Sequence, residues 1–202
     1  MMGKKGMTGI TISVIILIIS CSCREVAIPK PRGHFRIDLP ERQYIQFNKQ
    51  KGKNINIPLS FEYPVYGNLA FQEEKDADPG WFNIEFPKYR AKIYLTYKDV
   101  NNDLDSLLDQ SYDLNVKNHV SKADAIKEQV FSNRDNKVYG ILYDLKGNTA
   151  SAVEFYVTDS VRHYLRGSLY FTSEPNADSL SPVIDFFRAD IMHLIETLKW
   201  EN

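Results

Sequence analysis

The two cysteines, Cys21 and Cys23, carry the most reactive side chains near the start of the chain. Residues 18–21 read Ile-Ile-Ser-Cys, a branched aliphatic residue followed by two residues, the last of them small, and then cysteine. This pattern is typical of bacterial lipoproteins, in which the cysteine thiolate, the nucleophilic form, takes a diacylglycerol group. Cys23 fits less well, because the residue three positions before it is Ser20. We therefore expect Cys21 to be lipidated.

The residues before Cys21 have the composition of an export signal. Two lysines precede an apolar-leaning run at 10–19, and no acidic residue occurs before Glu25. A charged start, a short apolar run and a small residue before the cleavage point define such signals. The run is shorter than the roughly 20 residues that span a bilayer. We expect residues 1–20 to be removed; the alternatives are an ordinary signal peptide or an uncleaved membrane helix.

The remaining chain must be held together by its core. It has no cysteine beyond residue 23, which excludes a disulfide framework. Removal of the leader leaves 182 residues with a net charge of −3, because the leader holds two of the 25 basic residues and none of the 26 acids. That length suits one domain. A weakly acidic exported chain lacks the basic footprint of a nucleic-acid-binding protein.

Histidines and carboxylates elsewhere give no complete catalytic or metal-binding set. His193 and Glu196 are three residues apart on an expected helix, a spacing seen in metal sites, but no third or fourth ligand accompanies them. His163 falls on the core-facing register of an expected strand, which favours a packed histidine over a base. There is no phosphate-binding glycine loop and no Gly-x-Ser-x-Gly motif. We expect no metal, no cofactor and no enzymatic activity.

An Asp-x-Asn-x-Asp run at 99–103 has the spacing that opens a calcium loop. Leu104 then replaces the glycine that the turn needs, and Gln110 replaces the bidentate acid at its end. Helix capping explains the run better, with Asn102 as the expected N-cap.

Alternation of apolar and polar residues predicts the strands. It marks three strands before a helix, at 59–63, 82–86 and 93–95, and three in series after it, at 137–145, 150–157 and 163–171. Short turns at 147–148 and 159–160 separate the second series, as hairpins require. Residues 121–132 fit either a helix or a strand.

Two amphipathic helices are expected. The first follows Asn102 and has an apolar stripe of Leu104, Leu107, Leu108 and Tyr112. The second runs from about Pro182 to Lys199, with Ser181 as a cap and proline at the first helical position, where its missing N–H costs nothing.

These elements define the fold class and the organisation of the chain. About six strands and two main helices, in runs rather than in strict alternation, indicate an α+β domain with a mainly antiparallel sheet. We expect a leader at 1–20, a lipidated tether and extended lead-in at 21–57, and a single domain at 58–202.

The strand at 163–171 has one apolar face and one face rich in tyrosine and arginine. Tyr and Arg are enriched at interface hot spots, because they bury a large area and still form hydrogen bonds. The candidate interaction face consists of Tyr156, Tyr164, Arg166 and Tyr170. The alternative is that a helix of the same chain covers this face and that these residues are half-buried core.

Nine stretches covering nearly all of the chain after the anchor match a known family: PKPRGHFRIDLP at 29–40, FEYP at 61–64, WFNIEFP at 81–87, YRAKIYLTYK at 89–98, KADAI at 122–126, YGILYDLKGNTAS at 139–151, FYVTDS at 155–160, LRGSLYF at 165–171 and HLIETLKW at 193–200. In them the chain resembles GldD, the family of gliding-motility lipoproteins. His34 departs from the aromatic residue expected there. The resemblance implies an accessory of the gliding machinery tied to type IX secretion, with no enzymatic activity and no established site beyond the lipidated cysteine.

The order of the elements resembles a second family in fold alone. An opening FEYP-like strand, a helix, a strand meander and a long terminal helix are similar to the PsbP-like α-β-α sandwich. A likeness of fold carries no function.

Two functions from different classes follow. The first is a lipid-anchored accessory subunit that contacts other gliding-machinery envelope proteins and lipoproteins, on a membrane surface facing the periplasm. Ser22 after the cysteine favours the outer over the inner membrane. The alternative is a periplasmic module that binds an envelope ligand such as a glycan, or a cryptic hydrolase. A flat aromatic patch would favour the first, and a pocket ringed by polar groups the second.

Overall fold

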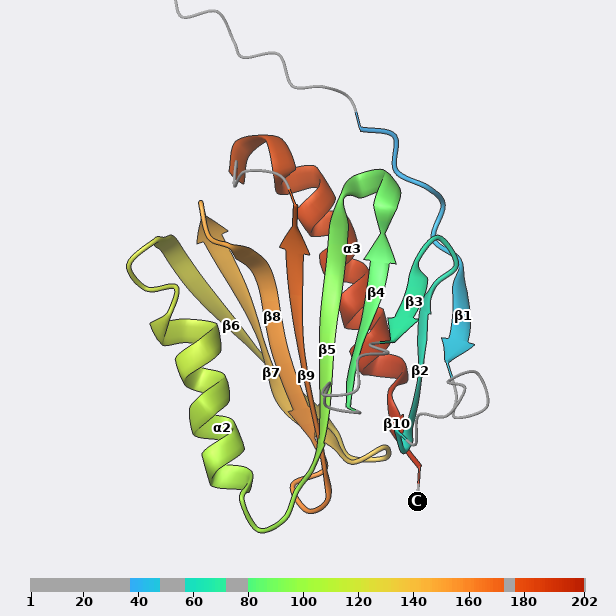
Figure 1. Ribbon diagram of the computed structural model, residues 1–202, viewed down its shortest axis with the longest axis vertical. Helices are drawn as coiled ribbons and strands as arrows, with labels where there is room; N and C mark the ends of the chain where they lie inside the picture. The colour runs from blue at the N-terminus through green and yellow to red at the C-terminus, as the bar shows by residue number, and fades with distance from the viewer. Residues whose placement is uncertain (1–36, 48–56, 72–79, 173–176, 202) are drawn as a thin grey trace, which may run out of the picture. The chain divides into compact units, whose positions relative to one another are not determined.

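The computed structural model describes residues 37–47, 57–71, 80–172 and 177–201. Cys21 and its leader lie outside these ranges, as does most of the expected tether. Figure 1 shows a large twisted sheet with helix α3 (Ala177–Thr197) behind it and the shorter helix α2 (Leu104–Tyr112) in front of it. No helix in the described ranges is long and apolar enough to cross a membrane.

The large sheet has seven strands in the order β3-β4-β5-β9-β8-β7-β6, and every neighbouring pair is antiparallel. The meander from β6 to β9 follows α2 and returns to pair with β5. The strand bounds are β3 (Asn68–Phe71), β4 (Trp81–Phe86), β5 (Ala91–Asp99), β6 (Ala123–Asn133), β7 (Val138–Gly147), β8 (Ser151–Thr158) and β9 (His163–Phe171).

A small sheet packs against the same core. It consists of β1 (Tyr44–Phe47), β2 (Leu59–Pro64) and β10 (Lys199–Trp200), in the order β1-β2-β10. Phe47 and Phe61 are buried and lie 4.9 Å apart between ring centroids, and both approach Phe82 of the large sheet. The segment at 21–57 therefore contributes a strand and two core side chains, Phe47 and Ile57, although a strand of four residues is too short to show a readable alternation.

The inner face of the large sheet, the face toward α3, is apolar. β8 and β9 present Phe155, Leu165 and Leu169 on it, all fully buried, as their alternation predicts. Helix α3 covers them with a stripe that includes Phe187, whose ring lies 4.4 Å from that of Phe86. Gly167 has no room for a side chain, because a Cβ there would lie 2.2 Å from Phe155 Cε1.

The predicted α+β class with a mainly antiparallel sheet is confirmed, with ten strands in the described ranges instead of about six. The additional strands are β1, β3, β10 and β6, which resolves the ambiguous segment at 121–132. Three of these four strands have two to four residues, and β6 lies at the sheet edge, where burial does not impose a clean pattern.

Two predicted helix starts are wrong. Helix α3 begins at Ala177, so Pro182 lies inside it, where the missing N–H removes a single backbone hydrogen bond. Asp103, not Asn102, is the N-cap of α2. Asn102 has φ 60, a left-handed conformation that asparagine tolerates better than most residues. A π-helical turn, η2 (Asp113–Lys117), continues α2, and a 3₁₀ turn, η1 (Pro87–Tyr89), joins β4 to β5.

Candidate functional site

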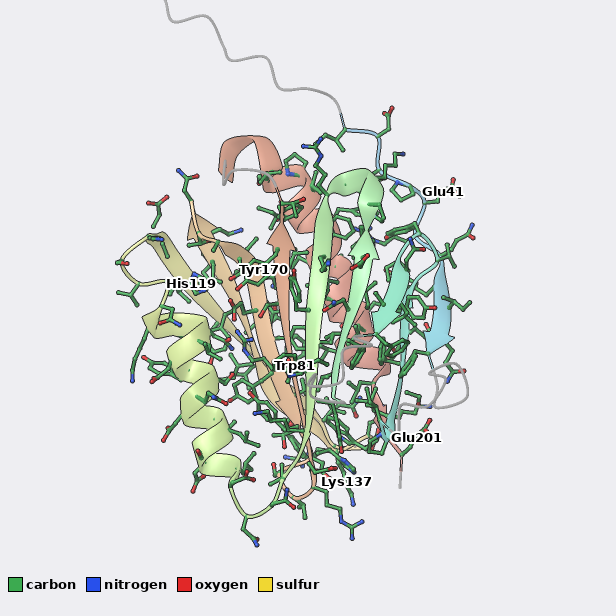
Figure 2. The ribbon with its side chains drawn as sticks, in the orientation of Figure 1. Glu41, Trp81, His119, Lys137, Tyr170 and Glu201 are labelled. Carbon is green, nitrogen blue, oxygen red and sulfur yellow. The ribbon has the colours of Figure 1, made fainter. Side chains whose placement is uncertain are left out.

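The outer face of the large sheet, the face toward α2, carries the residues of the predicted interaction face. Strand pairing arranges them in rows across the sheet: Trp81, Thr96, Arg166 and Tyr156 in one row, and Asn83, Tyr94, Ser168 and Glu154 in the next. Figure 2 labels Trp81 and Tyr170 on this face and His119 beyond the end of α2. The two ends of the rows differ, because α2 lies over the β8–β9 end only.

The covered half of the outer face is closed by α2 and η2. Tyr164 is only 3% exposed, and Tyr156 stacks on it with centroids 6.1 Å apart. Leu107 and Ser111 of α2 and Asn115 of η2 are buried on the facing side. Burial raises the pKa of the Tyr164 hydroxyl, and its hydrogen bond with Ser111 works in the opposite direction. Tyr164 is thus part of a packed layer within one chain.

A buried carboxylate organises this covered half. Glu154 is fully buried on β8 and pairs with the Arg166 guanidinium of β9. It also accepts a hydrogen bond from Ser151 Oγ at 2.5 Å and lies 3.2 Å from His119 Nε2. Arg166 Nε in turn donates to Asn115 Oδ1 at 2.9 Å. Because a buried charge is costly without partners, this cluster ties η2 and the following turn to β8 and β9.

Ser151, His119 and Glu154 form a serine–histidine–carboxylate cluster, but not a nucleophile relay. In such a relay the two ring nitrogens of histidine face the serine and the carboxylate separately. Here Ser151 Oγ and Glu154 Oε1 approach the same atom, His119 Nε2, at 3.3 and 3.2 Å. The serine is fully buried and donates to the carboxylate directly. The arrangement stabilises the fold and offers no exposed nucleophile.

The open half of the outer face is aromatic. Trp81 and Tyr94 are 43% and 42% exposed, and Tyr170 packs edge-on against Tyr94 at 5.5 Å. Lys92 lies over the Tyr94 ring at 5.4 Å and pairs with Glu85 at 2.7 Å. A cleft of about 210 Å³ separates this half from α2 and η2, with Trp81 on one side and the exposed Leu114 of η2 on the other. We call Trp81, Tyr94 and Tyr170 the open aromatic patch.

His193 and the run at 99–103, whose spacing resembles that of metal sites, make structural contacts. His193 Nε2 lies 2.6 Å from Glu62 Oε2 and stacks on Tyr44 at 3.7 Å, whereas Glu196 is exposed. In the run at 99–103, Asp103 Oδ1 accepts the Asn101 N–H at 2.7 Å, which is a turn contact. Within the described ranges, no group of three or more histidine, cysteine, aspartate or glutamate side chains could hold a metal ion.

A second polar cluster fastens β1 to α3. The buried Asp190 carboxylate accepts hydrogen bonds from the hydroxyls of Tyr44 at 2.9 Å and Tyr66 at 2.6 Å, and Arg42 Nε lies 3.5 Å away. Burial raises the pKa of Asp190, against the effect of these partners. Burial and then the bond to Asp190 raise the pKa of Tyr44 to about 12.

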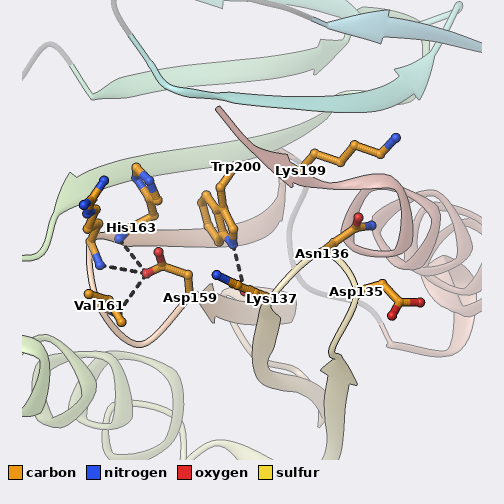
Figure 3. A pocket seen from close by; sticks show the side chains of 9 residues that line it. Asp135, Asn136, Lys137, Asp159, Val161, His163, Lys199 and Trp200 are labelled. Carbon is orange, nitrogen blue, oxygen red and sulfur yellow. Dashed lines mark hydrogen bonds between the residues drawn. The ribbon is translucent and has the colours of Figure 1, made fainter. Parts of the chain in front are cut away.

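A hollow lies where two hairpin turns meet the C-terminal strand (Figure 3). The turn between β6 and β7, the turn between β8 and β9, and β10 line it, and its volume is about 670 Å³. The sequence predicted the turn at 159–160. It did not predict that residues 137, 162 and 200 lie close together, because their proximity depends on the pairing of strands that are distant in the sequence.

The fold and the site define the class of protein. It is an α-β-α sandwich in which one helix contact is polar and hydrogen-bonded. It has an open aromatic patch, and the described ranges contain no catalytic relay. The family model of the gliding motility lipoprotein GldD matches residues 24–200, and the chain belongs to this family. The resemblance drawn from the sequence is thereby confirmed. The match begins after Cys21, so the expected lipidated residue lies just ahead of it.

Among solved structures, the chain is similar to the solution structure of cyanobacterial PsbP (CyanoP) from Synechocystis sp. PCC 6803. The TM-score is 0.47 and the sequence identity 13%, over 89% of this chain and 97% of that chain. No curated protein matches the chain.

Proposed function

We propose that this protein is a lipid-anchored accessory subunit of the gliding machinery, linked to type IX secretion, that works by protein contact and not by catalysis. The observation that carries the proposal is the family match over residues 24–200. The cryptic-hydrolase alternative receives no support from Ser151, His119 and Glu154, since the serine is buried and both partners meet one histidine nitrogen.

The partner surface in this proposal is the open aromatic patch. Its residues have the large, amphipathic side chains that carry interface energy, and they sit on paired strands of a rigid sheet. Lys92 and Glu85 at its rim are already paired with each other, so docking there need not desolvate an isolated charge. Of the predicted face, Tyr170 belongs to this patch. Tyr164 contacts α2, Tyr156 stacks on Tyr164, and Arg166 binds Asn115 of η2.

The anchor in this proposal is a diacylglycerol group on Cys21, which holds the domain at the periplasmic side of a membrane, the outer membrane being favoured. Multiple acyl chains make such attachment stable, because each buried CH₂ contributes about 0.8 kcal/mol. Cys21→Ala should abolish labelling by a palmitate analogue and release the protein from membranes, while Cys23→Ala should change neither. Label retained in Cys21→Ala and lost in Cys23→Ala would reverse the assignment.

Affinity purification of the tagged native lipoprotein from gliding cells tests the contact function. We expect other envelope proteins to co-purify, and we expect Trp81→Ser with Tyr94→Ser to lose them at an unchanged protein level. Val65→Ser with Val130→Ser is the matched control, since both valines are exposed outside the patch. Equal loss of partners in both double variants would contradict the choice of surface, and no partner for the wild-type protein would contradict the function.

A further inference from the structure

The hollow at the hairpin end of the large sheet shares no lining residue with the cleft beside the open aromatic patch. Its volume of about 670 Å³ lies within the range of roughly 300–1,000 Å³ that small-ligand sites occupy. Three segments distant in the sequence form it, namely the turns at 134–137 and 159–162 and strand β10.

One wall of the hollow is a fixed aromatic surface. The Trp200 indole stacks on the His163 ring, with centroids 5.2 Å apart and planes 12° apart. Its Nε1 donates to the backbone oxygen of Lys137 at 3.0 Å, a contact drawn in Figure 3. The ring is therefore held both by a neighbouring ring and by a hydrogen bond. A ligand that packs against it pays little ordering entropy, because the surface is preorganised.

His163 offers a hydrogen-bond acceptor in the same wall. Its Nδ1 lies 2.8 Å from the Tyr97 hydroxyl, and that hydroxyl donates its one proton to Asp99 Oδ1 at 2.7 Å. In the neutral ring, Nδ1 must then carry the proton and donate to Tyr97, which leaves Nε2 as an acceptor. Among the described residues Nε2 has no hydrogen-bond partner, and the ring lines the hollow. The acceptor is thus available to a ligand hydroxyl.

The rim of the hollow has an excess of free cations. Lys137, Arg162 and Lys199 are exposed, come from the three different segments, and have no acid within ion-pair distance among the described residues. Of the two lining acids, Asp159 is engaged by the turn. Its Oδ1 accepts the backbone N–H groups of residues 161, 162 and 163 at 2.8–2.9 Å. Burial acts to raise its pKa, but these three bonds hold that pKa below the usual value.

We propose that this hollow binds an anionic saccharide, a sugar unit that carries a carboxylate or a phosphate. The indole suits the apolar face of a sugar ring, the free imidazole nitrogen suits a hydroxyl, and the lysine and arginine groups suit the anion through charge-assisted hydrogen bonds. A neutral sugar cannot make the contact with the lysine and arginine groups, and a free anion cannot make the contact with the indole. The ligand reaches the site either as a soluble polysaccharide or as the head group of a membrane lipid, since both present the same chemistry.

The fluorescence of Trp200 reports on binding directly. The chain has two tryptophans, so Trp81→Phe leaves Trp200 as the single indole. The purified full-length lipoprotein in mild detergent is titrated with trigalacturonate, with glycerophosphoinositol, with neutral maltotriose and with inorganic phosphate. We expect a saturable change in Trp200 emission with at least one of the two anionic sugar probes. The affinity for maltotriose and for phosphate should be at least about tenfold lower. Trigalacturonate alone would identify the polysaccharide source, and glycerophosphoinositol alone the lipid head group.

Variants in the same background locate the site. Arg162→Ala with Lys199→Ala should weaken binding of the anionic probe at least about tenfold, with an unchanged melting temperature. Arg134→Ala is the matched control, an exposed cation in the β6–β7 turn that does not line the hollow, and it should change the affinity less than about twofold. No response to either anionic sugar, equal binding of maltotriose or phosphate, or full affinity in the double variant would each overturn the proposal. Gliding does not enter the measurement, so the outcome is independent of the proposed contact function.

Discussion

The two faces of the large sheet are covered by two different physical means. On the inner face, Phe155 and Leu165 meet the apolar stripe of α3, a helix of 21 residues. On the outer face, Arg166 donates to Asn115 of η2 and Tyr164 is hydrogen-bonded with Ser111 of α2, a helix of only nine residues. The inner contact is non-directional and scales with buried area. The outer contact is directional, because each buried polar group needs its own partner.

This difference explains why the outer face is only half closed. A short helix whose buried side is partly polar covers a limited area, and it is positioned where Glu154, Arg166 and Asn115 can satisfy one another. Beyond its reach the sheet presents Trp81 and Tyr94 to solvent. One sheet face therefore contains a packed half and a solvent-exposed half, and residue type alone does not separate the two.

The largest expected effect is on the covered half. Tyr164→Ala with Arg166→Ala should lower the free energy of unfolding by about 5 kcal/mol, from about 3–5 kcal/mol for a truncated packed aromatic and about 1–3 kcal/mol for a buried acceptor left without its partner. Thermal melting measures the loss, and Tyr164→Ala alone covers the case in which the double variant does not fold. Unchanged melting together with lost gliding would make these residues a partner surface.

Phe187→Ala on α3 removes an apolar contact of the inner face. We expect a loss of about 4 kcal/mol, since a fully buried phenylalanine that packs against Phe86 leaves a cavity that the sheet cannot fill. Urea unfolding should show a lower midpoint at an unchanged slope. A loss below about 1 kcal/mol would mean that α3 is held mainly by its polar contacts, which would remove the contrast between the faces.

On the open aromatic patch, substitutions should affect stability little. Trp81→Ser with Tyr94→Ser is expected to cost about 1 kcal/mol or less, because both side chains are more than two-fifths exposed. Spreading and cell movement on agar should nevertheless be lost. A melting temperature that falls as far as in Tyr164→Ala would show that the open half is structural as well.

The smallest expected effect concerns pH. Because burial raises the pKa of Asp190 in the folded chain above its ordinary value of 3.8, the folded chain binds this proton more tightly than the unfolded chain. The stabilising contribution is therefore fully present below pH 3.8 and is lost as pH rises through the folded pKa. Asp190→Asn should flatten the fall of the melting temperature over that interval, and an unchanged slope would contradict the assignment.

Sequence patterns predicted the strands in which apolar and polar residue types alternate. Among these strands, burial itself alternates along the whole of β5, whereas β2, β4, β8 and β9 are buried at most positions on both faces and β7 alternates only over its first half. Helix α3 buries an apolar stripe, and α2 buries Leu107 and Ser111. β3 and β10 are too short to carry a pattern. Pro182 suggested a helix start because proline is favoured at first positions, yet the backbone before it is also helical.

The sequence predicted which side chains of β9 share the outer face, but not which of them α2 covers. Alternation correctly separated Tyr164 and Arg166 from the inner face, but the position of α2 over them depends on contacts with residues 111 and 115, about 50 residues away. The exposure of Trp81 and the cluster of Ser151, His119 and Glu154 likewise arise from tertiary packing. No local pattern encodes such proximity.

Site-specific photo-crosslinking in gliding cells tests the division of the outer face most directly. Tyr94→p-benzoylphenylalanine places the probe on the open aromatic patch, and the same substitution at Val130, which is 74% exposed on the edge strand β6, is the control. We expect a discrete crosslinked envelope partner from position 94 and none from position 130. A crosslink from position 130 with none from position 94 would contradict the division of this face into a structural half and a docking half.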